Sequence, residues 1–134
     1  MTWANVLKVP ASALFAGPMP KAEVLRVQLD AGNDMRDLAP VTGGFLILTG
    51  LGRSDDNLAA RRSVIHFWDG RSETVKPLAK ITSADDGKPE ALQLIADSVA
   101  GNPYEVLVLM DGVKNGAPKV YGPGAMIPRA STGV

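Results

Sequence analysis

The sequence predicts an all-β, antiparallel protein built from two propeller-blade-like sheets plus an N-terminal strand pair. Three observations predict this fold class. Short apolar or alternating runs recur roughly every ten to twenty residues, while long helical periodicity is scarce. Glycine (14) and proline (10) are spread through all 134 residues, which suits many short strands joined by turns. Two segments repeat one order of strand, turn, buried strand, loop and strand, which is the plan of a four-stranded blade.

The first part of the chain predicts the strand pair and the first unit. The runs NVLKV (5–9) and AEVLRVQL (22–29) alternate or are apolar, as strands are, and DMRDLAPV (34–41) follows before a Gly-Gly break. The run GFLILTG (44–50) is apolar throughout, as expected of a strand buried on both faces. RSVIHFWDG (62–70) alternates and ends in an Asp-Gly turn signal. Pro77 makes VKPLAKI (75–81) an edge strand.

The second part predicts another unit of the same plan. EALQLIADS (90–98) fits either one short helix or a strand, YEVLVLMDG (104–112) is a strong strand, and PKVYGPG (118–124) is a short one. The two buried strands are further apart than in a common blade repeat of ~40 to 50 residues. We therefore expect a single propeller-like domain over 1–134, with blade-like units at about 22–81 and 89–124.

The sequence Gly50-Leu51-Gly52 follows an apolar strand, as a phosphate-binding loop would. A dinucleotide fingerprint needs a third glycine and a crossover helix. Here the third glycine position is Asp55, whose charge would repel a pyrophosphate, and residues 56–62 are too few for a crossover helix. We predict that this loop joins two antiparallel strands and binds no nucleotide, and that its glycines relax the backbone where the strand leaves the sheet.

Composition excludes several classes of function. Fourteen basic and fourteen acidic side chains cancel, so no bulk field attracts nucleic acid or an anionic membrane. The absence of cysteine excludes disulfides, thiolate nucleophiles and cysteine-ligated metals. No apolar run approaches the ~20 residues of a membrane span, and the N-terminus lacks the pattern of a signal peptide. We expect a cytoplasmic protein without nucleic-acid or membrane partners.

The order of several short motifs resembles an uncharacterised bacterial family, domain-of-unknown-function family 3616. Its members carry Arg-Asp-Leu-Ala, Gly-Tyr-Leu-Ile, Trp-Asp-Gly, Pro-Glu-Gly-Leu and Asp-Asp-Gly segments in that order. The match spans about residues 24–122, the C-terminal part of a full-length member, and departs from the pattern at Ala91 and Met110. The resemblance implies a β-propeller related to esterase-like and phytase-like propellers. The matching positions are Arg36, Asp37, Leu38, Gly44, Trp68, Asp69, Gly70, Pro89, Glu90, Asp111 and Gly112.

Four polar residues form the predicted ligand-binding set: Arg36, Asp37, Glu90 and Asp111. If each unit is a blade, Asp37 and Glu90 lie near the starts of inner strands, which converge around a propeller channel. Carboxylate oxygens there would suit Ca²⁺ or Mg²⁺. The favoured alternative is that Asp37 and Glu90 bond backbone amides while Asp111 shapes an Asp-Gly turn. We predict no catalytic residue, no metal ligand and no cofactor, with Ca²⁺ as the ion to test.

The remaining chemistry-bearing residues favour structural roles. His66 is the only histidine and has no H-x-x-x-H or G-x-S-x-G context, so we expect a structural residue on a partly exposed strand face. The pairs Asp55-Asp56 and Asp85-Asp86 are expected in solvated loops. Four aromatic residues could stack on sugars, although blade packing is the favoured role: Trp3, Trp68, Tyr104 and Tyr121.

Together these observations predict a small binding or scaffold module whose ligand, a small molecule or a glycan, is not specified. Two alternatives stay open: a metal-dependent hydrolase of phosphate or ester substrates, and an inactive, reduced descendant of a longer propeller. Two blades cannot close a ring, because closed propellers need ~4 to 8. We therefore expect a homo-oligomer, either three two-bladed protomers in a six-bladed ring or a symmetric dimer.

Overall fold

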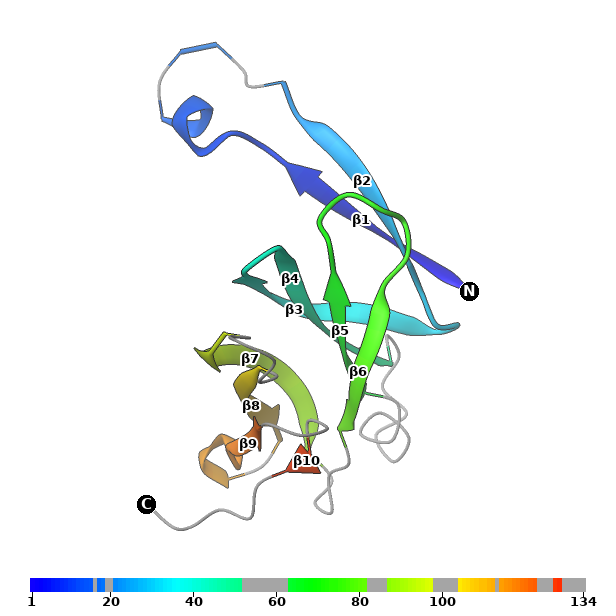
Figure 1. Ribbon diagram of the computed structural model, residues 1–134, viewed down its shortest axis with the longest axis vertical. Helices are drawn as coiled ribbons and strands as arrows, with labels where there is room; N and C mark the ends of the chain where they lie inside the picture. The colour runs from blue at the N-terminus through cyan, green and yellow to red at the C-terminus, as the bar shows by residue number, and fades with distance from the viewer. Residues whose placement is uncertain are drawn as a thin grey trace.

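In a computed structural model, the described residues form three antiparallel sheets and no α-helix (Figure 1). The structure describes residues 1–15, 17–18, 21–51, 63–81, 87–97, 104–112, 114–122 and 127–128. The all-β class predicted from the sequence is confirmed, as are the N-terminal strand pair and two further antiparallel sheets. No helix in these ranges is long and apolar enough to cross a membrane.

The N-terminal strand pair is a hairpin of β1 (Thr2–Lys8) and β2 (Glu23–Leu29), connected through the short 3-10 helix η1 (Ala11–Leu14). Its register pairs Thr2 with Leu29 and Lys8 with Glu23. Residues 23–29 therefore pair with β1 and not with the first four-stranded sheet, whose first strand begins at Asn33.

Each four-stranded sheet is a simple meander in chain order. The first contains β3 (Asn33–Val41), β4 (Gly44–Leu51), β5 (Ser63–Trp68) and β6 (Lys76–Ile81). The second contains β7 (Lys88–Ala96), β8 (Glu105–Asp111), β9 (Lys119–Gly122) and β10 (Ile127–Pro128), with the short 3-10 helix η3 (Lys114–Gly116) between β8 and β9. The segment that fitted either a helix or a strand is thus strand β7. This order, with hydrogen bonds only between successive strands, is that of a propeller blade.

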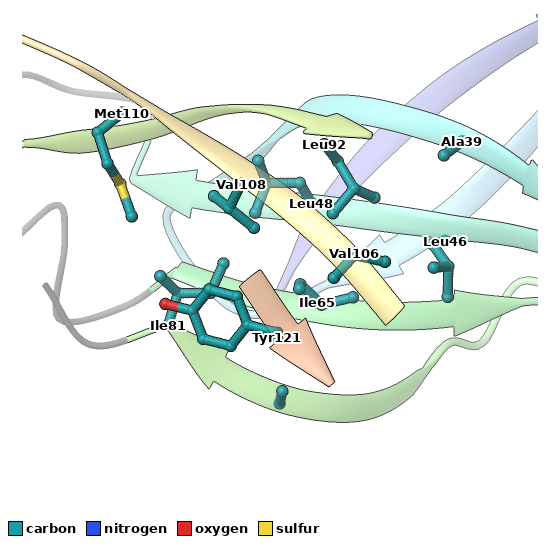
Figure 2. Packing of buried hydrophobic residues seen from close by; sticks show 11 residues of the cluster. Ala39, Leu46, Leu48, Ile65, Ile81, Leu92, Val106, Val108, Met110 and Tyr121 are labelled. Atoms are coloured by element: carbon teal, nitrogen blue, oxygen red, sulfur yellow. The ribbon is translucent and has the colours of Figure 1, made fainter. Parts of the chain in front are cut away.

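The three sheets are stacked face to face, with β3–β6 in the middle. On β4, Leu46 and Leu48 point into a core shared with β7–β10, while Ile47 between them points to a core shared with the hairpin. Both faces of β4 are therefore buried, which explains why its sequence is apolar without alternation. The larger core interleaves residues of the two four-stranded sheets, among them Leu48, Ile65, Leu92, Val106 and Tyr121 (Figure 2).

The turn between β3 and β4 depends on two glycines. Gly43 has a φ of +81°, in the left-handed region that glycine adopts at no steric cost. A Cβ atom at Gly44 would collide with the carbonyl oxygen of Trp68 on the neighbouring strand. The Gly-Gly break therefore fixes both the turn and the close approach of β4 to β5.

Candidate functional site

The predicted residues Arg36 and Glu90 form an ion pair between the two four-stranded sheets. Arg36 sits in the β-bulge of β3, where the register shifts between Met35 and Asp37, and Glu90 sits in the bulge of β7. A bulge adds one residue to its strand and redirects that residue's side chain. Arg36 Nη1 lies 3.0 Å from Glu90 Oε1, with the side chains 24% and 35% exposed. Arg36 Nη2 also donates to the carbonyl oxygen of Leu51.

Gly50 makes room for this ion pair. A Cβ atom there would lie 3.4 Å from Arg36 Nε and 3.3 Å from Ser63 Oγ, tighter than ordinary contact. The strands before and after this loop, β4 and β5, are antiparallel neighbours, whereas a dinucleotide-binding βαβ unit requires parallel strands. The prediction that the loop joins antiparallel strands is confirmed. Gly52 and Asp55 lie outside the described residues, as do Asp56, Asp85 and Asp86.

Asp37 links the same two strands through backbone groups. Its Oδ1 accepts the N–H of Leu38 at 2.8 Å, and its Oδ2 accepts the N–H of Leu92 on β7 at 2.7 Å. Strand β7 is the edge of its sheet, so the N–H of Leu92 points away from β8 and needs this acceptor.

A reciprocal contact, which sequence reasoning missed, closes the far end of β3. The carboxylate of Asp97, just after β7, accepts both the N–H (2.7 Å) and the hydroxyl (2.9 Å) of Thr42. Asp37 and Leu92 are 55 residues apart, and so are Thr42 and Asp97. The shared offset is known only from these hydrogen bonds, so the sequence alone carried no signal that identified Asp97.

Asp111 does not join the other three predicted residues. It ends β8, is exposed, and accepts the N–H of Gly112 at 2.8 Å, which shapes an Asp-Gly turn in which Gly112 has a φ of +80°. The structure thus brings together Arg36, Asp37 and Glu90, whose side chains bind other groups of the protein. No group of three or more metal-ligating side chains occurs in the described parts of the chain.

His66 is buried, so the prediction of a partly exposed strand face is wrong. It lies on β5 opposite Ile47, and β5 is covered because the hairpin and β7–β10 lie on the two sides of its sheet. Burial lowers the pKa of His66, against the smaller raising effects of the Asp30 charge and a hydrogen bond with the backbone of Ile47. Its Nδ1 has no hydrogen-bond partner among the described residues. His66 is therefore a neutral interior residue at pH 7.

Two of the four aromatic candidates cannot reach a sugar. Trp68 and Tyr121 are fully buried, and Trp68 Nε1 donates to the carbonyl oxygen of Ser72 at 2.7 Å. Tyr104 is half-buried and stacks on Phe67 with ring centroids 6.5 Å apart. Trp3 is exposed on the hairpin, where the guanidinium of Arg26 lies 4.6 Å from the ring centroid.

An open cleft lies where the hairpin separates from the first four-stranded sheet; we call it the hairpin cleft. Its volume is about 880 Å³. Val6, Val9 and Leu25 line it on the hairpin side, and Leu38, Phe45 and Trp68 on the sheet side. The half-buried ring of Phe45 packs against the buried ring of Trp68, with the two ring centroids 5.6 Å apart. Clefts of this size and mainly apolar lining are typical of small-molecule sites.

Three charged side chains line the same cleft: Lys8, Asp69 and Arg71. The Asp69 carboxylate accepts the N–H groups of Arg71 and Ser72, both at 2.8 Å, and the Ser72 hydroxyl at 2.9 Å. Those hydrogen bonds, with a smaller effect of the Arg71 charge, lower the pKa of Asp69. The Asp69 carboxylate is therefore committed to its own turn, and the lining has one more cation than anions.

Comparisons with protein-family models, with curated proteins and with solved structures found no match to this chain. The resemblance to family 3616 therefore rests on the order of its motifs.

Proposed function

We propose that the protein is a small binding module whose ligand site is the hairpin cleft. The observation that carries the proposal is an apolar cleft of about 880 Å³ with cations on its lining. Binding pockets for small molecules generally enclose ~300–1,000 Å³ and combine an apolar surface with a few polar groups that orient the ligand. The ligand has an apolar body that lies on Phe45 and an anionic end that faces Lys8 and Arg71.

The hairpin cleft supports this proposal better than the four residues singled out from the sequence. Arg36, Asp37 and Glu90 already bind one another's strands. No specific observation on the described residues favours the hydrolase alternative, which would call for several free carboxylates around one point. Glycan binding through Trp68 or Tyr121 is disfavoured because both rings are buried.

Octanoate and 1-octanol form a matched pair of ligands for the test, since they share a chain length and differ in charge. We expect octanoate to bind with 1:1 stoichiometry by titration calorimetry and to raise the melting temperature. At one hundred times Kd, a ligand that binds only the folded state stabilises it by about 2.7 kcal/mol. We expect 1-octanol to bind more weakly, because it lacks the charge that Lys8 and Arg71 attract.

Three variants locate the site. Val9→Asp places a negative charge on the hairpin side of the cleft and should abolish binding of octanoate and 1-octanol alike. Lys8→Glu should weaken octanoate while sparing 1-octanol. Lys80→Glu makes the same charge change at an exposed residue of β6, away from the cleft, and should bind as the unmodified protein does. Absence of binding by both ligands at millimolar concentration, or binding that Val9→Asp leaves intact, would refute the proposal.

A further inference from the structure

The two four-stranded sheets use equivalent positions for equivalent packing, although their sequences differ. The fourth residues of β4 and β8, Ile47 and Val108, are both fully buried and both face the preceding sheet in the stack. The second residues, Phe45 and Val106, lie opposite Trp68 and Tyr121 in the two registers. Trp68 and Tyr121 are therefore equivalent, and each fills the space toward the preceding sheet. The two sheets thus repeat the positions at which residues pack, and not the sequence.

The third and fifth residues of the same strands face the other way, toward the next sheet. In β4 these are Leu46 and Leu48, which are fully buried because β7–β10 covers them. In β8 they are Leu107 and Leu109; Leu109 is 39% exposed and Leu107 is half-buried. The second sheet thus repeats the surface with which the first sheet packs on its successor, but its own successor is missing from the described chain.

Neighbouring strands extend this surface, which we call the open face. On this face Leu107 lies between its strand partners Gln93 and Val120, and Ile95 and Leu109 follow at alternate positions along β7 and β8. By register, Gln93 corresponds to Ala39, because each pairs with the third residue of the following strand, and Ile95 is the extra residue of a second bulge in β7. Ala39 is buried in the shared core, whereas Gln93 is exposed and Ile95 is 51% exposed. The open face is therefore an apolar packing surface without a partner in the described structure.

The opposite end of the stack carries the complementary surface. The hairpin packs Ala4, Val6 and Val27 against β3–β6, and its outward side bears Trp3, Leu7 and Val24, which are 42%, 63% and 62% exposed. Trp3 faces away from β3–β6, toward the position of a preceding sheet. Each of the three sheets thus has a large aromatic residue that faces backwards along the stack: Trp3 on the hairpin, Phe45 and Trp68 on the first four-stranded sheet, and Tyr121 on the second. Trp68 and Tyr121 are buried there, whereas Trp3 is 42% exposed and is contacted by the guanidinium of Arg26 on its own hairpin.

We propose that the open face of one copy docks on the outward side of the hairpin of a second copy. Copies then stack head to tail in the order that the chain already shows: hairpin, first sheet, second sheet, next hairpin. The contact continues the internal stacking interface, because Trp3 would enter the open face as Tyr121 enters the face of β3–β6. Such a heterologous contact closes into a ring when the rotation between copies permits it. This proposal does not depend on the hairpin cleft, which lies on the inward side of the hairpin and shares only Leu7 with the outward surface named above.

Light scattering coupled to gel filtration, with sedimentation velocity over 1–100 µM, tests the contact on the full chain. We expect the unmodified protein to form oligomers. Leu109→Glu blocks the open face and Trp3→Glu blocks the hairpin side, so each alone should be monomeric. An equimolar mixture of the two should form a dimer and nothing larger, since each variant supplies one intact surface. Leu14→Glu makes a similar apolar-to-charged change at an exposed residue outside both surfaces and should assemble normally.

Far-UV circular dichroism shows that each variant is folded before it is compared. A monomeric unmodified protein at 100 µM would overturn the proposal. So would a folded Trp3→Glu variant that still forms oligomers, because a symmetric dimer through the open face needs no hairpin. A mixture of Leu109→Glu and Trp3→Glu that stays monomeric would equally contradict a head-to-tail contact.

Discussion

Removing the Asp37 carboxylate should destabilise the protein more than removing the charge of the neighbouring ion pair. Asp37→Ala removes the acceptor of two backbone N–H groups, those of Leu38 and Leu92. Leu92 belongs to the core between the sheets, and an unsatisfied buried N–H costs about 1–3 kcal/mol. With a smaller loss at Leu38, we expect roughly 2–4 kcal/mol. That is a large share of the ~5–15 kcal/mol that stabilises a typical domain.

Glu90→Gln is the matched comparison, because it removes a charge from the same junction and keeps a hydrogen-bond acceptor for Arg36. The Arg36–Glu90 pair is a quarter to a third exposed, so solvent screens it and the expected loss is below about 1 kcal/mol. Urea unfolding followed by circular dichroism measures both losses, and amide exchange of the Leu92 N–H reports the site directly. Equal losses for the two variants, or unchanged Leu92 exchange in Asp37→Ala, would refute the assignment of Asp37 as the main link.

Two further predictions concern the interior. Trp68→Ala should cost about 3–5 kcal/mol in urea unfolding, because a fully buried indole and its hydrogen bond to Ser72 are lost, whereas Phe15→Ala, at a 90% exposed ring, should change stability little. The pKa of His66 is lowered below 6.5 in the folded state, so the unfolded chain binds the extra proton as the pH falls through 6.5. The contribution of His66 to the free energy of unfolding should be constant above pH 6.5, and below pH 6.5 it should fall by at most about 1.4 kcal/mol per pH unit. His66→Leu should reduce this slope, and an unchanged slope in that variant would contradict the reasoning.

The sequence predicts the strands well because apolar runs and Gly or Pro breaks act locally. The run 44–50 became β4, buried on both faces, and the Gly-Gly break became the turn at Thr42 and Gly43. His66 was misplaced because alternation along a strand distinguishes the two faces of a sheet but does not say whether the second face is covered. Here both faces of β3–β6 are covered, so residues on either face of β5 are buried.

The candidate site was only partly predictable. Arg36, Asp37 and Glu90 do come together, because β3 and β7 are equivalent first strands that lie side by side. Their role as links between sheets depends on which backbone N–H groups point outward from an edge strand, and the two bulges that decide this leave no clear mark in the sequence. The hairpin cleft was not predicted at all, since it depends on the angle at which the hairpin leaves the sheet.

The hairpin cleft has its origin in the unequal widths of the stacked sheets. A hairpin of two strands covers one face of β3–β6, so Phe45 lines a cleft, whereas its equivalent Val106 is fully buried between two four-stranded sheets. The cleft lies on the inward side of the hairpin and the docking contact on its outward side, so the two proposed activities should separate. Trp3→Glu should lose assembly and still bind octanoate, while Val9→Asp should lose octanoate and still assemble. If Trp3→Glu also lost octanoate binding, the cleft would be completed by the neighbouring copy, and ligand binding would depend on assembly.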